Sequence, residues 1–492
     1  MAMDEVAAAP RYIAINRSQQ VLQPLDVDRL IDDNHAARKI WRVVEQLDLS
    51  RFESETLAVE GAAGRPSHSP QVLVAVWLYA YSKGLHSARE IARQMEHEPG
   101  LEWLTGLRAI NHHTLSDFRV GYGQALQELF EQVLAMLTMK GLIRLERVAV
   151  DGTKIRADVN KKSFRRCGKI EAHLEMARRH LRELAKQERE EQTTKREASA
   201  RQRAAREQEQ RLEEALAEIK RLRAAKKNDK TKEPQASSTD PTAGFMWMHD
   251  GGLAPAYNVQ ITADAAHGLI ADVEVVNDPQ DGQQIAPAMD RLRKRNGRYP
   301  PQCLADGGYT NNASVVAMDE RSIDYYSTWT GRNEGFAGRA ARRHDDYLLD
   351  RFGYDEETNE MICPEGKRLR YRQSRRTAGG EVHVYEAHAE DCGACPARER
   401  CCPDRKLDRG GRTASVQIYD AAIERFDEKM KQPEALALYK QRAPLVEFPN
   451  AWIKQKLKLR RFATRGLAKV RCEALWAAMT FNLQRMFRLA PA

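Results

Sequence analysis

Residues 147–155 have the sequence Arg-Val-Ala-Val-Asp-Gly-Thr-Lys-Ile, a short run rich in β-branched side chains with one acid, Asp151. The run predicts a β-strand that ends in a turn at Gly152, because Val and Ile favour strands and an Asp-Gly pair favours turns. Asp151 is then expected at the carboxyl end of the strand, which is the rim of an α/β sheet where ligands bind.

A second segment, Gln302-Cys-Leu-Ala-Asp306, has the same form and is stopped by Gly307-Gly308. Other strands and helices are predicted around these two segments. Strands are expected at 256–262, 269–276 and 323–328, with a turn at Gly268, and helices at 283–294 and 312–319. Mixed strands with helices between them indicate an α/β layer.

The first 145 residues are predicted to be helical. Ser87 with Glu90 resembles a capping box, the segment from Thr114 to Asp117 has the same form, and Pro70 suits the first turn of an apolar helix. Basic residues at the helix ends favour DNA binding over a plain helical domain, although no helix-turn-helix spacing is visible.

Residues 168–232 carry apolar side chains at three-four spacing, which predicts a coiled-coil helix or a helical hairpin. The residues concerned are Ile170, Leu174, Ala177, Leu181, Leu184, Leu212, Leu216, Ile219 and Leu222. Residues 226–242 are polar, contain two prolines and are predicted to form a mobile linker.

The composition suggests a protein with a polyanionic partner. The 492 residues carry a net charge of +9, which favours nucleic acid, although a basic surface without a partner is the simpler alternative. The longest apolar run, residues 72–81, is too short to cross a membrane, and no signal pattern is visible at the start. A cytoplasmic, nucleoid-associated location without a membrane partner is expected.

Two carboxylates at neighbouring strand ends could hold a divalent cation, and a two-metal site needs a third acid. The candidate is Glu447, two residues before Pro449, which is expected in the first turn of a helix; Lys454 lies two turns on, on the same face. Taken singly, each acid is more simply explained as a turn residue or a solvated side chain. The order of the three acids along the α/β pattern favours a joint site.

Several segments resemble the DDE transposases of insertion sequences. The acids lie in segments similar to those of that family, and Tyr439, Arg442, Glu447 and Lys454 resemble its Tyr-x-x-Arg, Glu, Lys signature. The similar segments are 148–156, 305–309, 464–470, 481–483 and, in the helical region, 64–66, 84–91 and 103–106. One departure is Asn450-Ala451-Trp452, where the family often carries Phe-Gly.

The resemblance implies a ribonuclease-H-like core in which Asp151, Asp306 and Glu447 bind two Mg²⁺ or Mn²⁺ ions. Tyr439, Arg442 and Lys454 are then expected to contact DNA. The implied partners are double-stranded DNA, at terminal inverted repeats and target, and a second copy of the chain in a homodimer. The alternatives are a ribonuclease-H-like nuclease without strand transfer and a domesticated, non-catalytic DNA-binding protein.

These predictions divide the chain into five parts. They are a helical DNA-binding domain at 1–145, the first part of the catalytic core at 146–165 and 240–330, a coiled-coil insertion with its linker at 166–239, a Cys-containing insertion at 331–428, and C-terminal core helices with the third acid at 429–492.

Five of the eight cysteines lie between residues 363 and 402. Cys392-Gly-Ala-Cys395 has zinc-ribbon spacing, and with Cys363 and Cys401 it could form a closed, structural Zn²⁺ site. Cys402 directly follows Cys401, so the second pair is irregular, and reduced thiols without metal are an equal alternative. Cys167, Cys303 and Cys472 are expected to be ordinary core or surface residues.

Overall fold

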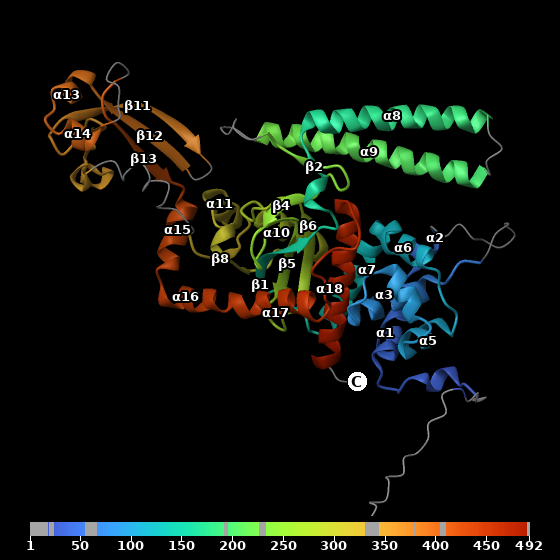
Figure 1. The fold of residues 1–492 in the computed structure, drawn as a ribbon. Coiled ribbons are helices and arrows are strands. Elements are labelled where there is room, and N and C mark those ends of the chain that lie inside the picture. The colour runs from blue at the N-terminus through green and yellow to red at the C-terminus, as the bar shows by residue number, and fades with distance from the viewer. Residues whose placement is uncertain are drawn as a thin grey trace, which may run out of the picture.

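The computed structural model describes residues 18, 24–54, 66–190, 195–225, 233–329, 344–377, 380–403 and 410–489. Gly64 and Arg65, which contribute to the N-terminal resemblance, lie outside these ranges. Within them the chain forms the mixed α/β fold that the sequence predicts, with a helical region on one side, a helical hairpin and a second sheet (Figure 1).

The central sheet has β1 in its middle. β1 pairs antiparallel with β5 on one side and parallel with β7 on the other, and β8 follows β7. β4 and β6 pair with successive parts of β5. The bounds are β1 (Arg147–Arg156), β4 (Gly244–Trp247), β5 (Leu253–Asp264), β6 (Ile270–Val276), β7 (Gln302–Ala305) and β8 (Asp324–Tyr326).

The predicted turn at Gly152 is wrong. β1 continues to Arg156 and stays paired with β5 along its whole length, so Asp151 lies inside a strand. Gly152 is needed for close packing instead: a Cβ there would lie 2.4 Å from Oδ1 of Asp281. An Asp-Gly pair usually marks a turn, but here the glycine leaves room for a neighbouring side chain.

Different helices cover the two faces of the sheet. Val148 and Val150 belong to the main core, together with residues of α10 (Ile285–Asn296) and α11 (Asn312–Glu320). Ala149 and Leu304 face the other way and pack with residues of α16 (Pro433–Lys440) and α17 (Arg442–Gln455). α15 (Ala421–Met430) precedes them.

α17 begins earlier than predicted. It starts at Arg442, so Pro449 lies inside the helix and not in its first turn. A proline there removes one backbone hydrogen bond. The buried side chains of Val446 and Ile453 on either side of Pro449 anchor the helix against the rest of the protein. The helix persists because this burial outweighs the lost bond.

The helical region begins with a short 3-10 turn, Val27–Leu30. Ser87 caps α4 and Pro70 opens α3, as predicted, but the segment at Thr114 is inside α6, whose cap is Asn111. Asn111 accepts from the backbone of His113 and so fixes the earlier start. The helices are α1 (Ala36–Val44), α2 (Ser50–Ser54), α3 (Pro70–Ser82), α4 (Ala88–Gln94), α5 (Pro99–Thr105), α6 (His112–Gly121) and α7 (Gly123–Met139).

α18 (Leu467–Leu489) connects the helical region to the sheet. The Trp476 indole N–H donates to the carbonyl of Arg119 at 3.2 Å. On the sheet side, the Asn482 amide accepts from the Ile270 N–H and donates to the Ile270 carbonyl, both at 2.8 Å. A single hydrophobic core therefore runs from the N-terminal helices through α18 into the sheet.

The helical hairpin is confirmed. α8 (Cys167–Glu190) and α9 (Lys195–Ala225) lie side by side (Figure 1). Their buried contacts include Ile170, Leu174, Ala177, Leu212, Ala215 and Ile219. The linker prediction is wrong for residues 233–242, since β2 (Phe164–Arg165) pairs with β3 (Ala236–Ser237) and Asp240 is buried against the hydroxyl of Tyr257. Residues 226–232 lie outside the described part.

The Cys-bearing insertion has its own antiparallel sheet. It lies away from the central sheet in Figure 1 and is joined to it through α15. Its elements are β9 (Gly353–Asp355), β10 (Glu360–Ile362), β11 (Arg368–Thr377), β12 (Gly380–Ala387), α13 (Ala389–Gly393), α14 (Arg398–Cys401) and β13 (Thr413–Tyr419).

Across all described residues, no helix combines the length and the apolar character that crossing a bilayer requires.

We predict that Asn482→Ala lowers the free energy of unfolding by about 2–4 kcal/mol, because it leaves the buried N–H and carbonyl of Ile270 without partners. Chemical denaturation of the full chain measures the change. Lys469→Ala, at an exposed position of the same helix, is the control and should shift stability by less than about 0.5 kcal/mol. Equal effects of the two substitutions would contradict the proposed role of Asn482.

Candidate active site

Asp151 and Asp306 lie side by side. Val150 of β1 is paired in parallel with Ala305 of β7, and each acid is the next residue of its chain. Ala149 and Leu304, two residues earlier, share the sheet face that α16 and α17 cover, so alternation places both acids on that face. Burial and then the charge of Asp306 raise the pKa of Asp151 to about 6.

Asp306 has the position that the sequence predicts. It follows β7 and caps the short 3-10 turn Gly307–Tyr309, where its Oδ1 accepts from the Gly308 N–H at 2.8 Å. Its backbone carbonyl accepts from the Ser327 hydroxyl at 2.9 Å. These bonds fix the carboxylate at the end of the strand.

α17 covers Asp151 with polar side chains. The Asn450 amide donates to Oδ2 of Asp151 at 2.8 Å, and the Arg442 guanidinium lies 3.9 Å from Oδ1. Burial lowers the pKa of Lys454, while the nearby charge of Asp151 opposes that shift. Asn450 belongs to the one segment that departs from the family pattern, and here it directly contacts the first acid.

Glu447 is on the same helix but is exposed. It follows Val446, whose side chain packs with Ala149 and Leu304. In the part of the chain that the structure describes, no three His, Cys, Asp or Glu side chains are arranged to hold a metal ion. The structure thus brings two of the three predicted acids together and places the third on the helix that covers them.

Tyr439 lies in the last turn of α16, just before Arg442 begins α17. Its hydroxyl lies 3.4 Å from that of Thr328, which follows β8. Tyr439 and Arg442 therefore flank the junction of the two helices, whereas Lys454 lies in the last turn of α17.

The sequence analysis missed Asp281, which lies in the loop before α10. Its carboxylate accepts from the amides of Asn258 at 2.6 Å and Gln260 at 2.7 Å and lies 3.3 Å from the Lys154 ammonium. Asp281 also raises the pKa of Asp151. The available signal was the pair of amides at alternate positions of an otherwise apolar strand, since buried amides need polar partners.

Comparison with known protein families covers both ends of the chain. Residues 362–487 match the family described as a transposase DDE domain, and residues 25–120 match the family described as transposase domain (DUF772). The two matches support an insertion-sequence DDE transposase. No curated protein and no solved structure matches the chain.

The DDE match includes the Cys-bearing insertion from Ile362 onward and the helices α15–α17, with Tyr439, Arg442, Glu447 and Lys454. The other match covers the region of α1 to α6. The family resemblance expected from the sequence is therefore confirmed.

We predict that Asp151→Asn stabilises the protein in metal-free buffer above neutral pH. Because the pKa of Asp151 is raised, the folded chain binds its proton more tightly than the unfolded chain, and stability falls as pH rises from about 4, the ordinary pKa of an aspartate, to about 6. Removing the charge should recover up to about 3 kcal/mol at high pH and little at acidic pH. Thermal unfolding at both pH values measures this effect.

The exposed Glu320→Gln is the control for that experiment and should show no such pH-dependent gain. If Asp151→Asn is no more stable than the native chain above neutral pH, then keeping the Asp151 charge half-buried beside Asp306 does not destabilise the fold.

Proposed function

We propose that the transposase cleaves DNA and joins its ends by metal-dependent phosphoryl transfer, with Asp151, Asp306 and Glu447 as its three acids. One observation supports this proposal most: two carboxylates from adjacent parallel strands lie side by side, and burial, followed by the charge of Asp306, raises the pKa of Asp151. A structural role alone would not favour two such charges together, since unpaired buried charges destabilise a fold.

The donor groups fit Mg²⁺ or Mn²⁺. These cations prefer carboxylate oxygens, and a divalent charge would neutralise the repulsion between Asp151 and Asp306. When two ions are bound, they supply an activated attacking oxygen and stabilise the leaving oxygen of an in-line displacement. The protein's contribution is to position the acids and to keep their charges in a partly buried place.

Glu447 completes the proposed set. Val446 packs on the strands that carry the two aspartates, and Glu447 is the next residue of α17, on the same helical turn. Asn450 and Arg442 contact Asp151 in the absence of metal. Release of these contacts would free Asp151 for a cation, and a shift of α17 along the sheet would turn Glu447 toward it.

The strand order supports a ribonuclease-H-like core. β6, β5 and β1 form an antiparallel set, while β7 and β8 continue in parallel with β1. In this arrangement the first acid is on the central strand and the second is at the end of its parallel neighbour.

Three residues of the signature are proposed to contact DNA. Arg442 and Lys454 would bind phosphates near the cut, and Tyr439 would orient the helix junction or stack on a base. The N-terminal helices would bind the terminal inverted repeats of the element. The target DNA would be a second double-stranded partner. Two copies of the chain would act as a homodimer. The α8–α9 hairpin is the candidate dimer contact.

A non-catalytic DNA-binding role is the second candidate. It is favoured by the bond from Asn450 to Asp151 and by the exposed position of Glu447. Both features are compatible with a site that never binds metal.

We expect Asp306→Asn and Glu447→Gln each to reduce cleavage of terminal-repeat DNA by about a hundredfold to a thousandfold or more, because each removes a proposed metal ligand. DNA binding by both variants should stay intact. Glu434→Gln, exposed on α16, is the control. Equal cleavage by Asp306→Asn and the native protein would contradict the role of Asp306 as a metal ligand. Failure of the native protein to join pre-cut DNA ends would identify a nuclease without strand transfer.

Lys454→Gln is expected to weaken DNA binding at every sequence and to reduce the slope of log affinity against log salt by about one, since one phosphate contact is lost. Lys456→Gln, exposed two residues later, is the matched variant and should have the smaller effect. A salt titration of binding measures both. An unchanged slope for Lys454→Gln would show that its ammonium does not contact a phosphate.

A further inference from the structure

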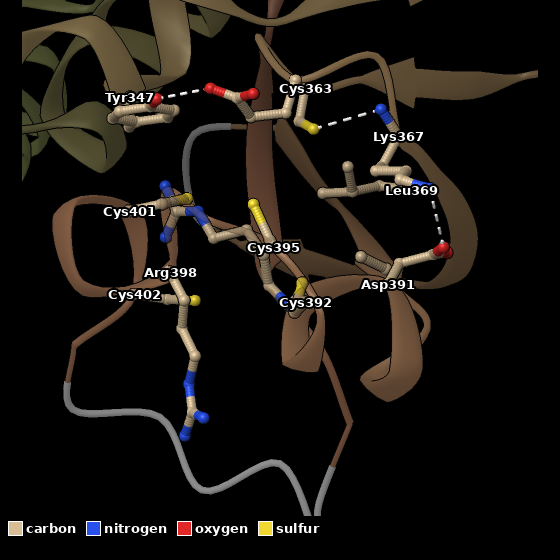
Figure 2. A pocket seen from close by; sticks show the side chains of 13 residues that line it. Tyr347, Cys363, Lys367, Leu369, Asp391, Cys392, Cys395, Arg398, Cys401 and Cys402 are labelled. Carbon is tan, nitrogen blue, oxygen red and sulfur yellow. Dashed lines mark hydrogen bonds and ion pairs between the residues drawn. The ribbon is translucent and has the colours of Figure 1, made fainter.

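Five cysteines line one small cavity in the Cys-bearing insertion. They come from three segments: Cys363 from the turn after β10, Cys392 and Cys395 from α13 and the residues after it, and Cys401 and Cys402 from the end of α14. The cavity has a volume of about 20 Å³, room for one water or one ion. Figure 2 shows the five sulfurs around this space.

Backbone N–H groups donate to two of these sulfurs. The Lys367 N–H lies 3.3 Å from Sγ of Cys363, and the Arg412 N–H lies 3.2 Å from Sγ of Cys392. The first of these bonds closes a tight turn in which Gly366 has a φ of 75°. A thiol sulfur accepts hydrogen bonds weakly, whereas a thiolate accepts them well. Both donors therefore suit sulfurs that carry negative charge.

No disulfide links the three segments that line the cavity. All of these cysteines are free thiols. Four such thiols around a space of this size suit one tetrahedral metal ion.

Among the described residues of the insertion, there is little hydrophobic core. Its apolar contacts form two small clusters, and most residues of β11 are exposed. The buried members are Phe352, Met361, Leu369, Tyr385, Ala387 and Ala414 in one cluster and Tyr347, Ala397 and Cys401 in the other. Small units with so little core depend on cross-links or bound metals for stability. The cysteine cavity lies where the two clusters meet, since Cys363 and Cys392 pack on the first and Cys395 on the second.

We propose that Cys363, Cys392, Cys395 and Cys401 bind one structural Zn²⁺ ion that holds the insertion together. Cys401 belongs to the buried cluster against which Cys395 packs, whereas Cys402 follows the end of α14 and is not a member of that cluster, so Cys401 is the preferred ligand of the pair. Since no three of the described His, Cys, Asp or Glu side chains form a ready metal set, the thiols must rotate into the cavity. Four thiols then release four protons to solvent and form four zinc–sulfur bonds.

A site closed by four thiolates leaves no open position for chemistry, so this ion would be structural. It would join the turn after β10 to α13 and α14. The insertion continues through β13 directly into α15, which leads to α16 and α17. Zinc would in this way stabilise the unit from which the helices of the candidate active site emerge.

The test is elemental analysis of the purified full chain. We expect one zinc per native chain, its loss in Cys395→Ser and its retention in Cys402→Ser, the matched control. Replacement of zinc by Co²⁺ should give the absorption of a tetrahedral thiolate site in the native protein and in Cys402→Ser only. If Cys395→Ser does not fold, release of zinc from the native protein by a thiol-modifying reagent gives the same information.

Three results would overturn the proposal. They are a native chain without zinc whose insertion still resists protease, retention of zinc by Cys395→Ser, and loss of zinc from Cys402→Ser. Asp151→Asn separates this site from the proposed catalytic one, because it should keep its zinc while losing cleavage. Failure of either proposal is thus visible without reference to the other.

Discussion

The parallel pairing of β1 with β7 is the constraint on which the candidate site depends. It brings Val150 beside Ala305, and the acids that follow become neighbours whatever else the chain does. Their mutual repulsion is retained at a largely buried position of Asp151, where water screens it poorly. Three polar groups of α17 offset this unfavourable contact: the amide of Asn450, the guanidinium of Arg442 and the ammonium of Lys454.

α17 therefore has two functions in the fold. Its apolar residues, such as Val446, cover the strands beneath the acids, and its polar residues neutralise Asp151. A helix that packs and neutralises at once is sensitive to the charge below it. Binding of a cation would replace part of the positive charge that Arg442 and Lys454 supply. The contacts of α17 with Asp151 would then stabilise the present position of the helix less.

Much of the fold could be predicted from the sequence, because strands and helices of the core have clear apolar patterns. Asp306 was placed correctly, since two glycines end its strand. Asp151 was misplaced at a strand end because an Asp-Gly pair has the same appearance in a turn and beneath a close neighbour. That neighbour, Asp281, could not be found, since its contacts with Asn258 and Gln260 join residues that are distant in the chain. The start of α17 was missed because its proline resembles a first-turn residue.

The shared core around α18 has a mechanical consequence. Trp476 binds the backbone of the N-terminal helices, and Asn482 binds the backbone of the sheet, so one rigid helix joins both parts. A nucleic acid held by the N-terminal helices could not pivot relative to the acids without breaking this buried framework. The distance along the DNA between the bound sequence and the scissile bond would then be fixed by the length of protein between the N-terminal helices and the acids.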